Sequence, residues 1–552
     1  MKAPQENAPL RSTFPRGPRG YTGVLGAPGV GLGRIRWVGT GAPPSGPSAA
    51  ASPADLTAAF DTVAARLRER ADALRAGGHT EPAEIVATMA LIADDPDLRG
   101  SATAELAAGR DPAGAVTAAA STYAELLAAL PDPTLAARAA DVRQVGRRVA
   151  GVLRGDPEST VDGPVILAGH ELGADDLLDV VDDLAGAVSQ LGGPNAHVAI
   201  VARALGVPLA FGVTPDAADG VPAVLDGATL ILAPTPAQEH AAREALRAAE
   251  RRRADLAAGR TLPAVTRDGE AVTLLANVAT AEESRAAVSA GAEGAGLVRT
   301  ELPFLTAPGW PDEAAHAAAL RPVLGPLAGL VATVRTLDFA PDKLPPFLEA
   351  GVARLRAATT TVDERRGRHS GRSYPGQPPP EALAAQLAAI VATGAGTRLR
   401  VMLPMVGSAA QVREARALLP EDVPLGAMVE TEAAVKAVDE IAAAADFLSI
   451  GTNDLTASLL GLGRQDPALT PARAAEPSVL RAIAATVAAG ERHGRPVSVC
   501  GDAAADPYAI PLLIGVGCRI LSVAPSALDT VRAQVRSLDA GECAAMAAAL
   551  LG

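Results

Sequence analysis

Seven short apolar runs in the second half of the chain constrain its fold more than any other feature. Each run ends in polar or charged residues, and helix-compatible stretches separate consecutive runs. Such alternation is typical of parallel strands joined by crossover helices. We therefore predict a (β/α)₈ TIM barrel over residues 263–552, built on the runs Val272–Asn277, Gly296–Glu301, Val331–Asp338, Leu399–Met405, Leu425–Glu430, Phe447–Asp454 and Val497–Asp502.

The carboxyl ends of these runs carry reactive residue types. In a (β/α)₈ barrel such positions meet at one rim, which is where the active sites of this fold lie. A competing interpretation is that the charges merely bound each strand, but a random surface would not gather so many reactive side chains at one rim. The rim residues are Asn277, Arg299, Arg335, Asp338, Met405, Glu430, Asn453, Asp454 and Cys500.

The predicted rim combines cations with paired carboxylates. Arg299 and Arg335 carry guanidinium forks that match phosphate and carboxylate oxygens, and Arg464 follows close enough to add a third cation. Glu430 and Asp454 come from consecutive strands and form a candidate Mg²⁺ site that leaves positions open for substrate oxygens. The rim therefore suits a small, highly anionic metabolite with both phosphate and carboxylate groups, a description that phosphoenolpyruvate fits.

Two further residues near the rim have candidate chemical roles. Cys500 ends a strand, where its thiol could act as a general acid or base, although most free cysteines are buried packing residues. Lys343 follows Asp338 by five residues and could supply a point charge.

A histidine in the first half of the chain stands at the end of a glycine-opened turn. The segment runs from Gly192 to Arg203, and His197 is followed by small and β-branched apolar residues that can begin a helix. A helix start offers free N–H groups and a positive dipole end, both of which suit an anion. His197 could thus accept a phosphoryl group on a ring nitrogen. The alternative is a histidine of the core, packed in a strand–turn–helix.

The chain divides into five segments by composition and periodicity. We expect a disordered extension over 1–24 and an α/β domain formed by 25–45 and 150–233. Four runs with helical apolar spacing predict a four-helix unit over 50–149, inserted into that domain. The charged, alanine-rich stretch 234–262 predicts a linker helix, and the barrel follows over 263–552.

Composition excludes several classes of protein. The net charge of −13 argues against a nucleic-acid partner. No stretch has the ~18 uncharged apolar residues of a membrane span, and the N-terminus lacks the apolar region of a signal peptide. The three cysteines have the spacing of neither a zinc site nor a disulfide framework, which fits a reducing cytoplasm.

Taken in order, the motifs resemble Enzyme I of the bacterial sugar phosphotransferase system, the phosphoenolpyruvate–protein phosphotransferase. The resemblance covers roughly residues 25–552. It rests on the stretches Arg138–Arg148, Gly193–Arg203, Gly294–Glu301, Thr333–Asp338, Val401–Met405, Gly426–Thr431, Phe447–Leu455 and Cys500–Asp502.

This resemblance implies roles for specific residues. His197 becomes the phosphohistidine, and Cys500 protonates the enolate. The inserted helical unit docks the phosphocarrier protein HPr, and two chains form a homodimer through the barrel. Phosphoenolpyruvate is bound by Arg299, Arg335, Asn453 and Arg464, and Mg²⁺ by Glu430 and Asp454.

The chain departs from the family pattern in two places. Asn195-Ala196 precede the histidine where the family usually has Thr-Ser. The family's Asn-Pro-x-Leu-Gly-x-Arg motif is not recognisable, and residues 349–380 read instead as an irregular tract rich in Arg, Ser, Gly and Pro. We hypothesise a shifted reading frame or relaxed selection there. The irregular sequence of residues 349–380 also offers a reason why only seven strands are found.

Two other functions remain open at this point. The missing arginine motif is compatible with a catalytically impaired regulatory homologue that binds phosphoenolpyruvate or HPr without turnover. A dikinase or pyruvate-phosphorylating synthase would share the phosphohistidine and the barrel. Such an enzyme needs a nucleotide-binding domain, and no glycine-rich phosphate loop with a lysine occurs here.

Overall fold

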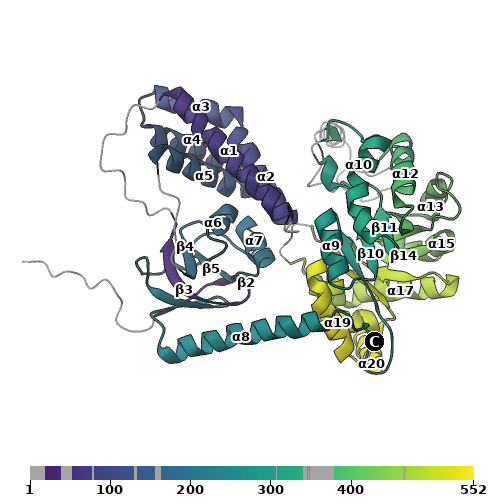
Figure 1. Ribbon diagram of the computed structural model, residues 1–552. Helices are drawn as coiled ribbons and strands as arrows, with labels where there is room; N and C mark the ends of the chain where they lie inside the picture. The colour runs from purple at the N-terminus through teal and green to yellow at the C-terminus, as the bar shows by residue number, and fades with distance from the viewer. Residues whose placement is uncertain are drawn as a thin grey trace, which may run out of the picture. The chain divides into compact units, whose positions relative to one another are not determined.

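The computed structural model shows two compact units, formed by residues 1–252 and 253–552. Figure 1 traces the chain through both. The structure describes residues 19–38, 52–76, 80–129, 133–155, 163–194, 196–305, 307–339, 345, 347–348, 378–463, 466 and 468–552.

The second unit contains a closed barrel of eight strands, and each strand runs parallel to both of its neighbours. This confirms the predicted barrel. Its strands are β9 (Thr273–Val278), β10 (Gly294–Val298), β11 (Val331–Arg335), β12 (Arg398–Leu403), β13 (Leu425–Val429), β14 (Phe447–Ile450), β15 (Val497–Val499) and β16 (Ile520–Val523).

The eighth strand is β16, and it lies well beyond the irregular tract where its loss was expected. It closes the barrel on β9, with Ile520 opposite Thr273 and Val523 opposite Ala276. The sequence pattern missed it because the run is short and ends in Ala524-Pro525, without the polar residues that mark the other seven. Residues 349–377 lie outside the described part of the chain.

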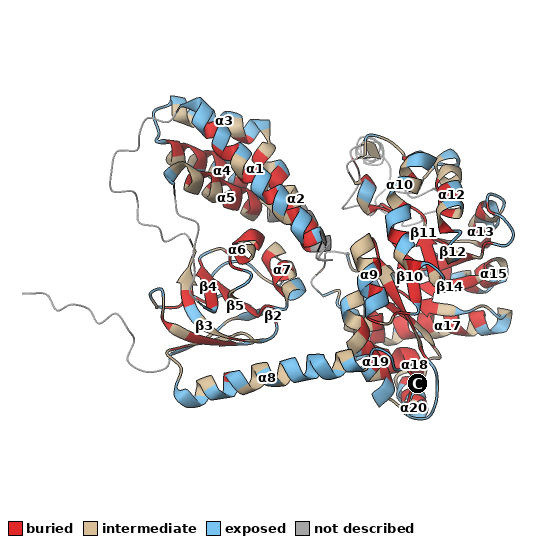
Figure 2. Cartoon of the chain, viewed as in Figure 1, coloured by how far each residue is buried: buried red, intermediate tan, exposed pale blue. Residues whose placement is uncertain are grey.

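Helices cover the outside of the barrel. The apolar side chains of the strands form two layers, one packed against the helices and one in a separate cluster. Strand residues such as Val401 and Leu403 belong to the large cluster shared with the helices, whereas Met402 and Met428 belong to a small separate cluster with Cys500. Figure 2 shows the strands as the most buried part of this unit. The helices are α9 (Ala281–Ser289), α10 (Glu313–Leu324), α12 (Pro380–Gly394), α13 (Ala409–Arg416), α14 (Glu432–Lys436), α15 (Val438–Ala444), α16 (Thr452–Leu460), α17 (Pro477–His493), α18 (Ala509–Gly515), α19 (Leu528–Ser537) and α20 (Ala540–Leu551). Short 3₁₀ turns occur at η1 (Leu302–Phe304), η2 (Gly325–Leu327), η3 (Pro471–Ala475), η4 (Asp502–Ala505) and η5 (Pro525–Ala527).

The first unit is built on an eight-stranded sheet in the order β1-β8-β7-β3-β4-β5-β6-β2. Helices α6 (Ala174–Leu178) and α7 (His197–Leu205) lie between this sheet and the helical unit (Figure 1), and both contact helix α2. The strands are β1 (Arg19–Thr22), β2 (Val24–Ala27), β3 (Val30–Trp37), β4 (Val165–Gly169), β5 (Leu184–Ser189), β6 (Leu209–Phe211), β7 (Pro222–Asp226) and β8 (Thr229–Leu232).

The start of this sheet corrects the end of the disordered extension predicted over 1–24, whereas residues 1–18 lie outside the described part of the chain. Strand β1 begins at Arg19 and pairs antiparallel with β8, with Arg19 opposite Leu232. An edge strand is held by backbone pairing and does not need the apolar alternation of a buried strand. The polar stretch Arg19–Thr22 therefore gave no strand signal in the sequence.

The inserted helical unit contains five helices in the described residues, where four were predicted. They are α1 (Pro53–Ala76), α2 (Thr80–Asp94), α3 (Pro96–Ala107), α4 (Pro112–Ala128) and α5 (Pro133–Arg154). The one missed is α3, which coincides with none of the four apolar runs from which the helices were predicted. It buries only Leu98 and Ala102 and so lacks a clear apolar stripe, while Asp95 caps its N-terminus by accepting from the N–H groups of Asp97 and Leu98.

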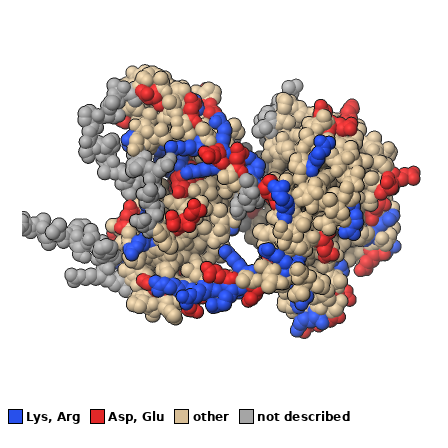
Figure 3. All heavy atoms as spheres, viewed as in Figure 1, with Lys and Arg blue, Asp and Glu red and all other residues tan. Residues whose placement is uncertain are grey.

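Helix α8 (Pro236–Ala258) connects the two units, whose boundary falls within it. Ala242 is its one buried residue. Most of this helix is exposed or intermediate in Figure 2, and charged side chains of both signs line it (Figure 3). A helix so exposed gains little from packing, and ion pairs such as Arg243–Glu239 at 2.7 Å give it modest support. Among the described residues no helix combines the length and apolar character needed to cross a membrane.

Candidate active site

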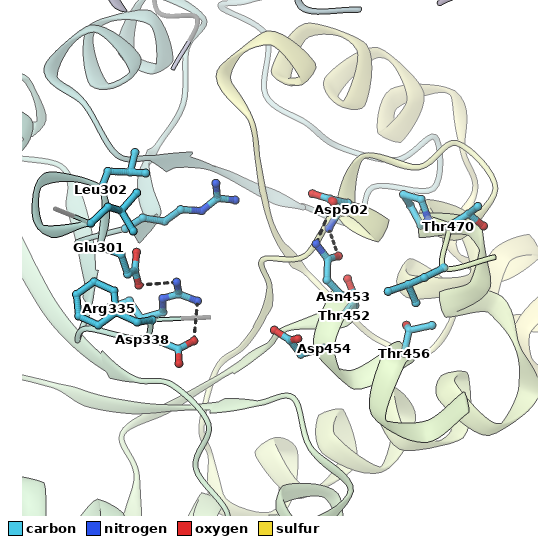
Figure 4. Close-up of a pocket in the computed structure, with 15 residues that line it drawn as sticks. Glu301, Leu302, Arg335, Asp338, Thr452, Asn453, Asp454, Thr456, Thr470 and Asp502 are labelled. Atoms are coloured by element: carbon cyan, nitrogen blue, oxygen red, sulfur yellow. Dashed lines mark hydrogen bonds and ion pairs between the residues drawn. The ribbon is translucent and has the colours of Figure 1, made fainter. Parts of the chain in front are cut away.

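A cavity of about 450 Å³ opens at the carboxyl ends of the barrel strands. Figure 4 shows side chains from the β10 and β11 ends facing those of α16 and η4 across it. Five of the rim residues predicted from the sequence line this one cavity: Arg299, Arg335, Asp338, Asn453 and Asp454. Its lining is Arg299, Glu301, Leu302, Leu305, Arg335, Asp338, Phe339, Thr452, Asn453, Asp454, Thr456, Leu469, Thr470, Pro471 and Asp502.

The two arginines of the cavity differ in environment. Arg299 directly follows β10 and is exposed, whereas Arg335 ends β11 with its side chain 15% exposed. Arg335 Nη2 lies 2.6 Å from Glu301 Oε1, and Nη1 lies 3.8 Å from Asp338 Oδ2 (Figure 4). Burial by itself lowers the pKa of Arg335, but the carboxylates of Glu301, Asp338 and Glu430 outweigh it and raise the pKa. Arg335 is thus a fixed cation held in a set orientation.

A buried glutamine supports the Arg335 segment and was not foreseen. Gln386, on α12, donates to Thr300 Oγ1 at 3.2 Å and accepts from the Leu337 N–H at 2.9 Å. Thr300 Oγ1 in turn donates to the Arg335 carbonyl at 3.0 Å. This network ties the ends of β10 and β11 together. No motif in the sequence pointed to Gln386, because its role depends on packing between distant segments.

Three carboxylates gather on the same side of the barrel. Glu430, 1% exposed after β13, accepts the Met405 N–H at 2.6 Å. Met405 has φ +51, a left-handed conformation uncommon for a side chain of this kind. Burial raises the pKa of Glu430 to about 8, and the nearby charges of Asp338 and Asp454 add to the increase.

This donor set fits a divalent cation that prefers oxygen ligands. Carboxylates close enough to raise one another's pKa are stabilised by a shared positive charge. Within the described ranges, no group of three or more His, Cys, Asp or Glu side chains is arranged as a complete metal site. Mg²⁺ held by Glu430 and Asp454 would therefore take its other ligands from substrate and water.

Asn453 is oriented by Asp502, a cavity residue to which no role was assigned from the sequence. Asn453 Nδ2 donates to Asp502 Oδ2, and the Asp502 N–H donates to Asn453 Oδ1, both at 2.9 Å (Figure 4). Gly501 makes this pairing possible by its close approach. A Cβ there would lie 2.0 Å from Thr452 Oγ1 and 2.6 Å from Thr452 N.

Replacing Gly501 by alanine is therefore expected to displace the start of α16 and to lower kcat/KM for the substrate. A misplacement near 1 Å costs on the order of 100-fold in rate. Steady-state kinetics of the Gly501→Ala variant check this. Gly396→Ala serves as the control, because a Cβ at Gly396 meets no atom within 4 Å. Equal rates for the two variants would contradict the expectation.

Cys500 lies next to the cavity without lining it. The residue is 5% exposed, and its Sγ lies 3.6 Å from the Ile450 carbonyl oxygen. Burial raises the pKa of this thiol to about 11, Ser449 opposes the shift by hydrogen bonding, and Glu430, Arg335 and Arg299 also influence it. The thiol is therefore protonated at neutral pH and can donate a proton.

Three residues singled out in the sequence fall outside the described part of the chain. They are Arg464, predicted to bind substrate, and Lys343 and Asn195.

His197 belongs to the first unit and is the first residue of α7. Arg203 lies further along the same helix. It donates to the carbonyls of Gly26 and Pro194, both at 2.9 Å, and so holds the turn before the histidine in place. The His197 side chain is 26% exposed, and its Nδ1 lies 3.0 Å from Asp141 Oδ2. The predicted turn and helix start are both present, and the ring is accessible from solvent.

Three protein-family models match most of the chain. The model described as "PEP-utilising enzyme, PEP-binding domain" matches residues 253–540. The "PEP-utilising enzyme, N-terminal" model matches 22–138, and the "PEP-utilising enzyme, mobile domain" model matches 161–230.

Curated relatives agree with these matches. The phosphoenolpyruvate-protein phosphotransferase of Streptomyces coelicolor is 34% identical over 96% of this chain and 95% of its own length. Multiphosphoryl transfer proteins of Rhodobacter capsulatus and Xanthomonas campestris are 35% and 37% identical over 80% and 74% of this chain. The chain spans about half the length of these two relatives, 54% and 50%.

Proposed function

The chain belongs to the family of PEP-utilising enzymes of the Enzyme I type, and on that premise we propose that it transfers the phosphoryl group of phosphoenolpyruvate to His197 and then to a histidine of HPr. This would be the first step of the sugar phosphotransferase system. Relatives named phosphoenolpyruvate-protein phosphotransferase support phosphoenolpyruvate-dependent transfer. The comparisons give no support to the alternative of a catalytically impaired homologue.

The observation that carries this proposal is the convergence of Arg299, Arg335, Asn453 and Asp454 on one cavity. Phosphoenolpyruvate carries a phosphoryl group and a carboxylate on a short carbon frame. Two guanidinium groups and an amide can hold both anionic ends and keep the P–O bond in line with an incoming nucleophile. We assign Arg464 to the same substrate site on the strength of the family resemblance.

Glu430 and Asp454 would hold Mg²⁺ at this site. When bound, the cation neutralises charge on the phosphoryl and carboxylate oxygens of the substrate. Glu430 is oriented for this role by the Met405 N–H, which engages one carboxylate oxygen at 2.6 Å.

His197 is the proposed nucleophile. Its Nδ1 faces Asp141, and among the described residues Nε2 has no hydrogen-bond partner. Nε2 is therefore the nitrogen available for the new N–P bond. The electron pair of the broken P–O bond leaves on the enolate oxygen of pyruvate.

Cys500 is proposed to protonate the enolate carbon. Replacing it with alanine should lower kcat for pyruvate formation by about 10²–10⁴-fold, the usual contribution of a general acid. The KM for phosphoenolpyruvate should change little, because the cavity is lined by other residues. Steady-state pyruvate assays measure both constants.

Cys543→Ala is the matched control for this variant, since Cys543 is also buried but lies on α20. An unchanged kcat in Cys500→Ala would assign proton delivery to another group.

The remaining assignments concern partners. We propose that the helical unit docks HPr, as the family resemblance implies. Its surface carries exposed apolar side chains that a partner could contact, namely Leu91 on α2 (61% exposed) and Leu126 on α4 (63% exposed). We also propose a homodimer through the barrel and a cytoplasmic location.

Incubation with phosphoenolpyruvate labelled in its phosphoryl group tests the function. With Mg²⁺ present, the intact chain should gain an acid-labile label near one per chain and release pyruvate in equal amount. Added HPr should then remove the label. Absence of label on correctly folded protein would reject the proposal.

A further inference from the structure

We propose that Asp141, which the helical insertion contributes to the His197 site, is a positioning residue for the histidine. Its carboxylate accepts the Nδ1 proton of His197, which leaves the lone pair on Nε2 for the phosphoryl group. The proposal rests on the proposed function of His197. It gives the insertion a second task beside docking a partner protein.

The contact itself is short and sheltered. His197 Nδ1 lies 3.0 Å from Asp141 Oδ2 and 3.2 Å from Oδ1. The Asp141 side chain is 5% exposed, whereas that of His197 is 26% exposed. The carboxylate is thus fixed inside the protein, and the ring reaches from it toward solvent. A carboxylate that binds one ring nitrogen selects the tautomer with the other nitrogen free.

Ion pairs hold helix α5 against the α/β sheet unit around this contact. Arg143 binds Glu171 through two nitrogens, each 2.9 Å from a carboxylate oxygen. Arg148, one turn further, pairs with Asp179 at 2.6 Å and contacts Asp175. Figure 3 shows acidic and basic side chains adjoining in this region. Bidentate and clustered pairs of this kind fix orientation well, so they set the position of Asp141.

Close packing between α5 and the loop before α6 adds to the restraint. The Gln144 side chain, one turn from Asp141, occupies the space where Gly173 lacks a Cβ; a Cβ there would lie 1.5 Å from Gln144 Oε1. Gly173 therefore lets α5 approach the sheet unit closely. Without that approach the Asp141 carboxylate would lie too far away to bind the ring.

The carboxylate also fits the charge balance of the transfer. When the Nε2 lone pair forms the N–P bond and the P–O bond breaks toward the enolate, the ring keeps its Nδ1 proton and becomes cationic. Asp141 faces that proton and compensates the charge. The other cation near Asp141 is Arg138, whose Nη1 is 3.7 Å from Oδ2 and makes no hydrogen bond in the described residues, so it competes weakly for the carboxylate.

Nitrogen NMR of the full chain labelled with ¹⁵N-histidine tests the proposal without any substrate. The His197 signals are identified by their loss in His197→Gln. We expect a protonated Nδ1 and an unprotonated Nε2 in the wild type at pH 8, and a shift toward the other tautomer in Asp141→Asn. Asp141→Glu, which keeps the carboxylate, should restore the wild-type tautomer at least in part.

Phosphorylation kinetics supply the second readout. Asp141→Asn should lower the rate of label uptake from phosphoenolpyruvate by about 10- to 100-fold, by analogy with the loss of a carboxylate that orients a metal-binding histidine. The KM for phosphoenolpyruvate should stay the same. Asp182→Asn, which alters an exposed carboxylate of the same unit, is the control and should behave as wild type.

The outcomes separate this proposal from the proposed function. An unchanged tautomer and an unchanged rate in Asp141→Asn would overturn the positioning role. If the wild-type chain showed the predicted tautomer but took up no label, the phosphotransferase function would be rejected. The Asp141 contact would then be structural only, and the positioning role proposed here would be overturned as well.

Discussion

Replacing His197 by glutamine is expected to reduce label uptake from phosphoenolpyruvate to the detection limit. Glutamine keeps a polar side chain of similar length at the start of α7 but has no nucleophilic ring nitrogen to accept the phosphoryl group. Phosphoenolpyruvate binding should persist, because its proposed ligands lie on the barrel. Label incorporation and isothermal titration with phosphoenolpyruvate measure the two effects separately.

His170→Gln is the matched control for this change. His170 belongs to the same unit, is exposed, and has its Nδ1 2.7 Å from Gln190 Oε1. We expect normal label uptake there. If His197→Gln still carried acid-labile phosphate, the phosphohistidine would have to be sought at another residue.

Arg335→Lys should lower kcat/KM for phosphoenolpyruvate by about 10²–10³-fold, the cost typical of one lost donor to a reacting oxyanion. Lysine keeps the positive charge next to Glu301 and Asp338, so the carboxylates remain compensated and the fold is preserved. It cannot present two parallel N–H groups to the substrate. Removing the charge altogether would mix this effect with destabilisation, because Arg335 is largely buried among those carboxylates.

Arg285→Lys provides the comparison. Arg285 lies on α9 with its side chain 59% exposed, and within the part of the chain that the structure describes it forms an ion pair with Glu282 of the same helix. Its exchange should leave kcat/KM unchanged. Similar losses in both variants would mean that Arg335 acts through overall stability and not through the substrate.

The barrel and its rim were predictable because the end of a strand can be recognised in the sequence and, in a parallel barrel, fixes where the following residue lies. Runs that end in Arg299, Arg335 and Asp454 belong to different parts of the chain, yet parallel strands bring their carboxyl ends to one rim. The turn and helix start at His197 were predictable for a similar reason, since both are encoded within a dozen residues.

The parts that the sequence did not reveal depend on contacts between distant segments. Asp141 and His197 are separated by 56 positions, and Gln386 meets Thr300 across 86. No local pattern encodes such pairs. Strand β16 and helix α3 were missed for the opposite reason, because each is short and carries a weak periodic signal of its own. Edge strand β1 takes its structure from β8, more than 200 residues away.

The placement of the helices between β3 and β4 has a consequence for how the chain acquires its structure during synthesis. Most contacts within residues 53–154 join helices that are consecutive along the chain, such as α1 with α2 and α4 with α5, so helices of this kind form within about microseconds to milliseconds of leaving the ribosome. The sheet into which these helices are inserted stays incomplete until β8 emerges and pairs with β1. The barrel stays open until β16 pairs with β9. The edge of β9 therefore stays unpaired until β16, the last strand of the barrel, has been synthesised. Truncation of the C-terminal segment should leave this edge permanently exposed and lead to aggregation.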